Sequence, residues 1–266
     1  MAELLLLTYL LAALSGGIVG SISFPIVMGR SIMFALTLLH SILGGAILGV
    51  YLNSALQLSI PIPLVAALTA IGFSILTAEL VERRMSEDVA TALSVAAATT
   101  MTIVFSYLAS HISSTAISTA WGYVMGVSAI ATEWDITVAA MALIIVAPVI
   151  HMILKEFRYI AFDEEGAKSL GLNVRFYRYI FYSLVSAASA VLSSTIGVLV
   201  THVLLAVPGA LALRVGRRHI LITYSASLSI ILLGYLMGRL LGIPPSGGVG
   251  ILSVVVIIGM LVYERG

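Results

Sequence analysis

The sequence contains no cysteine, and only 9% of its 266 residues are charged. Without thiols the chain can form neither a disulfide nor a thiolate metal site, and it has no thiol nucleophile. Soluble domains carry roughly a quarter charged residues. Because this chain has far fewer, we expect most of its surface to face lipid rather than water.

The sequence motifs of soluble enzymes are also missing. There is no glycine-rich phosphate loop ending in Lys-Ser/Thr, no His-Glu-x-x-His metal motif and no Gly-x-Ser-x-Gly nucleophile elbow. A formal net charge of +1 provides no basic field that would attract nucleic acid. We therefore expect no enzymatic activity, no nucleic-acid partner and no tightly held cofactor in this chain.

Long apolar runs fill the chain instead, with 61% hydrophobic residues and a mean hydropathy of +1.15. A helix of about 18 or more such residues crosses a hydrocarbon core of about 30 Å. Hydropathy predicts an all-α, polytopic membrane helix bundle, with residues 1–266 forming a single transmembrane domain. The expected spans are residues 4–28, 31–51, 60–82, 88–110, 134–154, 176–196, 198–213, 220–240 and 247–263.

Basic residues predict the orientation of these spans. Residues 1–28 lack a basic n-region and a cleavage-like site, so we expect them to be retained as the first span. With the N-terminus outside and the C-terminus cytoplasmic, nearly all Lys and Arg residues fall on the cytoplasmic side, and only Arg239 disagrees. The expected location is the cell membrane, with lipid around the bundle.

Two segments are expected to be irregular. Counting residues 113–131 as a crossing would invert every later loop, so we interpret this segment as re-entrant or interfacial, with Trp121, Tyr123 and Trp134 at the headgroup level. The short span around Pro208 is a candidate broken helix, because proline removes a backbone donor and kinks the chain.

Two histidines are the candidate residues of a transport pathway. His40 lies near the middle of the span 31–51, and a neutral imidazole there can bind a borderline metal ion. His202 lies in the short span that contains Pro208. For both, the alternative is a histidine that packs against a neighbouring helix and bonds to its backbone.

The longest polar stretch predicts a short helix outside the bilayer. Asp163 suits the N-cap, Glu164 suits the first turn, and Gly171 suits the position after the helix end. Such a helix is either a solvated connector or a docking element for a partner protein.

The chain resembles the permease subunits of zinc and manganese ABC importers over nearly its whole length. The residues that carry the resemblance are Arg30, His40 and Gly45, the segments Arg83-Arg84-Met85-Ser86-Glu87-Asp88 and Trp121-Gly122-Tyr123-Val124-Met125-Gly126, the helix from Asp163 to Leu172, and the later segments 197–200, Pro208-Gly209-Ala210 and Pro244-Pro245-Ser246-Gly247-Gly248.

This resemblance implies a homodimeric permease that imports a divalent metal ion, zinc or manganese. A separate ABC ATPase subunit would bind and hydrolyse ATP, and an extracytoplasmic solute-binding protein would deliver the ion. The short helix would be the coupling helix that contacts the ATPase. The implied contact residues are Asp163, Glu164, Ala167, Leu170 and Gly171.

Two positions depart from the family pattern and leave the substrate open. The family usually has an aspartate four residues before this histidine and a proline four residues after it, whereas this chain has Leu36 and Gly44. Without that carboxylate a divalent ion has poorer charge compensation near His40. A permease of the same architecture for a metal chelate or another small solute is therefore the alternative hypothesis.

Two other classes of membrane protein are less well supported. A secondary transporter needs acidic residues inside the membrane and usually an inverted repeat. A membrane-embedded enzyme needs a polar cluster inside the bilayer. The sequence provides only dispersed histidines.

Overall fold

The computed structural model describes residues 2–112, 118, 122, 132–216 and 218–263. Within this part of the chain all regular secondary structure is helical. The helices are α1 (Ala2–Met28), α2 (Ile32–Leu56), α3 (Ile62–Glu82), α4 (Glu87–Ile112), α6 (Glu133–Phe162), α7 (Glu164–Ser169), α8 (Val174–Ile196), α9 (Val198–Val215), α10 (His219–Leu241) and α11 (Pro245–Tyr263).

Nine of the described helices are long and apolar enough to cross a membrane, which confirms the predicted polytopic bundle. The clearest difference from the prediction is α6, which continues to Phe162 rather than ending near residue 154. A capping box between Thr132 and Asp135 begins α6, and the polar residues after 154 include no helix breaker. The last turns of α6 therefore carry the chain beyond the apolar core to α7.

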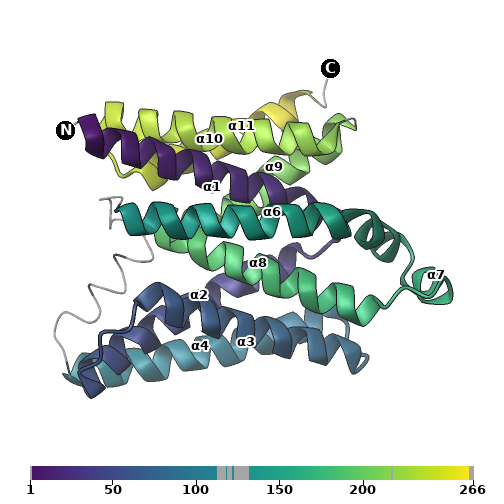
Figure 1. Ribbon diagram of the computed structural model, residues 1–266, viewed down its shortest axis with the longest axis horizontal. Coiled ribbons are helices and arrows are strands. Elements are labelled where there is room, and N and C mark those ends of the chain that lie inside the picture. Colours follow the sequence, from purple (N-terminus) through teal and green to yellow (C-terminus); the bar gives the residue numbers. More distant parts are fainter. Residues whose placement is uncertain (1, 113–117, 119–121, 123–131, 217, 264–266) are drawn as a thin grey trace.

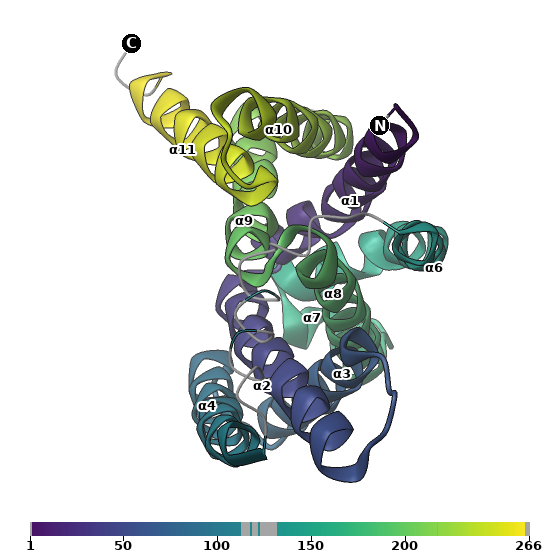
Figure 2. The same ribbon diagram turned by 90° about the vertical axis from the view of Figure 1, so that its left-hand side faces the viewer.

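The helices form two groups, joined by α8 and by direct contact between α2 and α9. On one side α2 packs against α3 and α4; on the other α1 packs against α9 and α10, and α10 against α11. Helix α8 contacts α3 from the first group and α1, α6 and α9 from the second. Figures 1 and 2 show these groups at opposite sides of the molecule, with α7 projecting at one end.

Glycines lie where neighbouring helices approach closely. A Cβ added at Gly20 would lie 3.0 Å from the backbone of Tyr224 in α10, and one at Gly45 would lie 2.8 Å from the backbone of Ala66 in α3. Small residues let the backbones meet, which provides packing contacts where lipid offers no hydrophobic drive between helices.

The prediction of a broken helix at Pro208 is wrong. Helix α9 runs unbroken through Pro208, and the break lies at Gly197, where φ is 91° and one residue separates α8 from α9. Glycine adopts this backbone conformation without steric cost. Near Pro208, the Ser23 hydroxyl of α1 bonds to both the Leu205 carbonyl oxygen and the Gly209 amide, which supports the helix there.

The predicted re-entrant segment 113–131 lies outside the described residues apart from Ser118 and Gly122, so this prediction stays untested. Trp134 is described: it is 64% exposed in the first turn of α6, as an aromatic residue at the headgroup level would be.

Candidate transport and coupling sites

The two candidate pathway histidines lie side by side although they belong to different helix groups. The ring centroids of His40 on α2 and His202 on α9 are 6.3 Å apart, with the rings nearly perpendicular. His40 is exposed on the surface of the chain, whereas His202 is half-buried. His40 lies about twice as far from Leu56 as from Ile32, so it is nearer the α7 end than the predicted midpoint.

The tautomer of His202 is set by its own helix. Its Nδ1 lies 3.1 Å from the Val198 carbonyl oxygen, which can only accept, so Nδ1 carries the proton. Such a bond restrains the ring and leaves Nε2 as the nitrogen that carries the lone pair. Among the described residues, no group of three or more His, Asp or Glu side chains could hold a metal ion together. The pair is therefore a two-imidazole arrangement, without a carboxylate in that part of the chain.

The predicted short helix is present as α7, with caps at both ends. The Asp163 carboxylate accepts a hydrogen bond of 2.9 Å from the Gly166 amide at the N-cap. At the other end Gly171 has φ of 81°, and the Leu172 amide donates to the Ala167 carbonyl oxygen. This pairing is the Schellman motif, which ends the helix sharply.

The side chains of α7 divide between the bundle and the surroundings. Ala167 is only 2% exposed and anchors α7, whereas Leu170 is 74% exposed. Phe162, the last residue of α6, is 93% exposed at the other end of α7. These two large apolar side chains are therefore available for contact at the two ends of α7. The sequence had not identified Phe162 as part of this surface.

Charges on α7 are paired across one helical face. Lys168 contacts Glu164 at 3.0 Å and Glu165 at 2.9 Å. Burial acts to raise the pKa of Glu164, but the hydrogen bond from Lys168 and the positive charge of Arg178 outweigh it and hold this pKa below its ordinary value. Hydrogen bonds to Glu165 and, to a smaller extent, to Glu164 raise the pKa of Lys168 above its ordinary value.

Arg178 joins α7 to the end of α3. Its guanidinium donates to Glu164 of α7 at 2.7 Å and forms a short ion pair with Glu82 of α3. The Arg178 side chain is 12% exposed and that of Glu82 is 24% exposed. One signal was available in the sequence, a charged residue in the first turns of an apolar span, but its partners 14 and 96 residues away could not be inferred from it.

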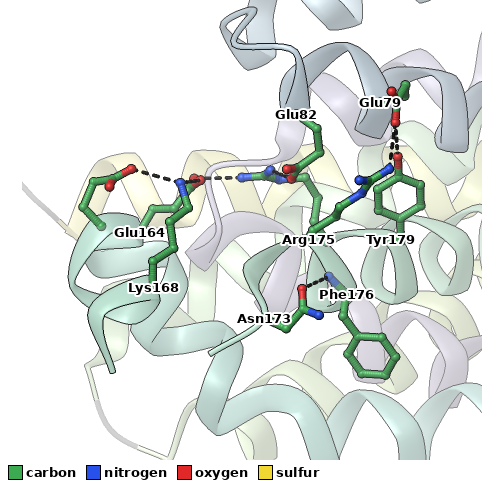
Figure 3. Close-up of polar contacts among 10 residues, drawn as sticks. Glu79, Glu82, Glu164, Lys168, Asn173, Arg175, Phe176 and Tyr179 are labelled. Atoms are coloured by element: carbon green, nitrogen blue, oxygen red, sulfur yellow. Dashed lines mark hydrogen bonds and ion pairs between the residues drawn. The ribbon is translucent and has the colours of Figure 1, made fainter. Parts of the chain in front are cut away.

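A second cluster lies on the same end of α3. Glu79 pairs with Arg83 at 3.0 Å, as their spacing of four residues predicts. It also accepts from the Tyr179 hydroxyl at 2.6 Å and from Arg175 at 3.2 Å, both on α8 (Figure 3). Two successive turns of α8 therefore hold the last turns of α3.

A polar cavity of about 880 Å³ lies between α7 and the turn that joins α3 to α4. It is lined by Val81, Glu82, Arg84, Met85, Ser86, Glu87, Glu164, Glu165, Lys168 and Arg178. Arg178 thus lies in the wall of this cavity as well as between the two helices.

Comparison with known proteins agrees with this architecture. The fold is similar to PsaBC from Streptococcus pneumoniae, solved in complex with Fab: TM-score 0.76, 17% identity, covering 94% of this chain and 88% of that chain. It is also similar to an ABC transporter assigned to the metal-chelate type, in an inward-facing conformation: TM-score 0.67, 19% identity, covering 97% and 85% of the two chains. No curated protein matches the chain.

The family follows from a match over almost the whole sequence. The model of the ABC 3 transport family matches residues 1–264, which include all the spanning helices and α7. The predicted resemblance to ABC permeases is confirmed by this match. The chain belongs to the ABC 3 transport family and is a multi-pass membrane permease subunit of an ABC transporter.

Proposed function

We propose that this permease imports a divalent metal ion, zinc or manganese, and that His40 and His202 contact the ion during its passage. The observation that carries the proposal is the 6.3 Å between the two ring centroids, which brings together imidazoles from two helix groups. Two imidazoles that share one zinc ion through bonds of about 2.0–2.1 Å have ring centroids roughly 5–6 Å apart. A small movement of α2 toward α9 would bring the pair to that separation.

A site of two neutral imidazoles suits brief contact with a transported ion better than permanent binding of that ion. Structural zinc sites use four protein ligands, whereas this pair supplies two nitrogen atoms and no charge. A transported ion must leave as readily as it enters, so weak coordination is compatible with conduction.

The exposure of His40 supports a homodimer with the pathway between the two copies. His40 is exposed on an otherwise apolar helix. A histidine in that place is costly against lipid and is expected to face protein or a water-filled cavity. A second permease copy would cover this face, and an extracytoplasmic solute-binding protein would deliver the ion to the outer mouth. The chain would lie in the plasma membrane, with its N-terminus outside the cell and its C-terminus in the cytoplasm.

Helix α7 is the element we assign to coupling with a separate ABC ATPase. Its caps at Asp163 and Gly171 fix its direction, and Leu170 together with Phe162 offers an apolar contact. Glu164 and Ala167 hold α7 on the permease rather than presenting it to the partner. ATP would be bound and hydrolysed in the ATPase alone.

The second candidate function is import of a metal chelate or another small solute by the same architecture. Leu36 stands where the family pattern has an aspartate, and the described residues near His40 supply no carboxylate group for a bare ion. A chelate carries its own ligands, so it would not need that carboxylate.

The test is transport by the complete complex in liposomes. The permease, its ATPase and its binding protein are reconstituted, and uptake of zinc and of manganese is measured with ATP. Replacing His40 or His202 with Ala should lower uptake at least tenfold, while His111→Ala serves as a matched control because its ring bonds locally to Tyr107. Uptake of neither ion by an assembled complex that hydrolyses ATP would refute the metal-ion proposal and favour the chelate.

A further inference from the structure

We propose that Arg178 is the positioning residue that transmits movement of α7 to α3, and so changes the separation of His40 and His202. This inference rests on the proposed coupling role of α7. It concerns a residue that contacts neither ATP nor the transported ion.

The contacts of Arg178 join three elements at one point. Arg178 lies on α8, Glu164 on α7 and Glu82 in the last turn of α3. The guanidinium is planar and uses separate nitrogens for the two carboxylates, Nη1 for Glu82 and Nη2 for Glu164. A planar fork of this kind fixes direction as well as distance, which a lysine ammonium does not.

Burial makes the ion pairs of Arg178 stiffer than the other ion pairs at the same end of the helix bundle. The Arg178 side chain is 12% exposed, whereas those of Arg83 and Arg175 are 72% and 63% exposed. Exposed ion pairs contribute little because water and salt screen them. Separating a shielded ion pair leaves a poorly solvated charge without its partner, which is costly. We therefore expect α3, α7 and α8 to move together rather than to break the ion pairs of Arg178.

Movement at the end of α3 would reach α2 through close backbone contact. A Cβ added at Gly45 of α2 would lie 2.8 Å from the Ala66 backbone and 2.7 Å from Thr69 Cβ on α3. Gly45 is little more than one helical turn from His40. Such contact leaves little room for α3 to move without α2, because packed interiors yield little volume.

The second histidine belongs to the other group. His202 is on α9, which packs mainly on α1, α10 and α11 and has smaller contacts with α8 and α2. The Ser23 hydroxyl of α1 bonds to α9 at Leu205 and Gly209. A displacement carried from α7 through Arg178 to α3 and α2 would therefore change the distance between the two rings.

The experiment measures this displacement and needs no transported ion. The natural chain has no cysteine, so Leu56→Cys on α2 and Leu240→Cys on α10, 60% and 76% exposed, can be labelled selectively with nitroxides. Labelled permease is diluted into unlabelled permease, assembled with its ATPase, and the distance distribution is measured by pulsed EPR without nucleotide and after trapping with ATP and vanadate.

In the otherwise unmodified labelled chain we expect the distance to change on trapping. Arg178→Gln and Glu82→Gln should each reduce that change at least threefold while the ATPase stays bound and hydrolyses ATP. Glu82 is on α3, so its effect cannot come from altering α7 itself. Arg175→Gln and Glu165→Gln, which remove exposed pairs, should leave the change intact.

The inference is overturned if Arg178→Gln and Glu82→Gln show the full change in the distance between the labels. It is also overturned if trapping does not change that distance in the labelled chain without either substitution. If Arg178→Gln does not assemble, Glu82→Gln decides the question alone, because the amide keeps the size of the side chain. A complex that moves its labels but imports neither zinc nor manganese would refute the proposed substrate and leave the role of Arg178 supported.

Discussion

The Ser23 hydroxyl of α1 stands between two backbone groups of α9 and accepts a hydrogen bond of 2.8 Å from the Gly209 amide. It also donates to the Leu205 carbonyl oxygen at 3.0 Å. In a regular helix the Gly209 amide and the Leu205 carbonyl would pair with each other. The Ser23 hydroxyl therefore bonds α1 directly to the backbone of α9 beside Pro208.

Replacing Ser23 with Ala should destabilise the fold by about 0.5–1.5 kcal/mol, because it removes the buried hydrogen bonds that join α1 to α9. Reversible unfolding in mixed micelles measures this free energy. Ser225→Ala is the matched control, since that hydroxyl bonds only within its own helix at an exposed position. Equal stability of the two variants would contradict the bridging role of Ser23.

Gly209→Ala should be still more damaging. A Cβ at Gly209 would lie 2.4 Å from the Ser23 carbonyl oxygen, a backbone atom that cannot rotate away. Overpacking of this kind costs about 1–3 kcal/mol or more. Gly72→Ala provides the opposite case, because its Cβ would meet nothing within 4 Å and alanine favours the helix. Thermal unfolding should show a loss for Gly209→Ala, and no loss for Gly72→Ala.

Substitution at Gly171 should act through backbone strain alone. Its φ is 81°, and an added Cβ would meet nothing within 4 Å. Gly171→Val should loosen the end of α7 by about 1–2 kcal/mol, whereas Gly171→Asn should be tolerated, because asparagine visits the left-handed region. Hydrogen exchange of the Leu172 amide, which bonds to Ala167, reports the difference. Similar protection in both variants would argue against strain as the cause.

Acid should loosen α7, whereas changes near neutral pH should not. The pKa of Glu164 lies below its ordinary value of 4.5, so its stabilising contribution is complete above that value and is lost as the pH falls through the lowered pKa. The pKa of Lys168 is raised, so its contribution is complete below its ordinary value of 10.5 and is lost only as the pH rises through the raised pKa.

A nitroxide at the exposed position Ser169 tests this expectation by its mobility. Its spectrum should stay constant from pH 6 to 8 and become more mobile below about pH 4.5, where Glu164 begins to lose charge. A transition centred between pH 6 and 7 would show that a different group controls α7.

Sequence reasoning succeeded where the signal is local. The spans follow from the length of apolar runs, and α7 follows from the N-cap at Asp163 and the stop at Gly171, because these depend on residues within a few positions of each other. The Glu79–Arg83 pair follows from the same short spacing.

Reasoning from a single residue type was less successful at Pro208. Proline weakens a helix in isolation, but α9 continues through Pro208, and Ser23 from a helix far away in the sequence bonds to its backbone there. The actual break at Gly197 depends on one positive φ, whereas Gly16, Gly20 and Gly45 lie within continuous helices. Whether a glycine bends or continues a membrane helix is decided by its neighbours in space.

The sequence by itself determined that this protein is a helical membrane bundle, because apolar length and capping are properties of short segments. Its similarity in sequence to a known family identified it as a permease. Only the tertiary structure decided that His40 meets His202, that Arg178 joins α7 to α3, and that Ser23 supports α9. Each of these pairs joins different helices, and hydropathy carries no information on which faces of two helices meet. Packing geometry fixes those faces, through small residues that allow close approach and buried polar groups that require a partner.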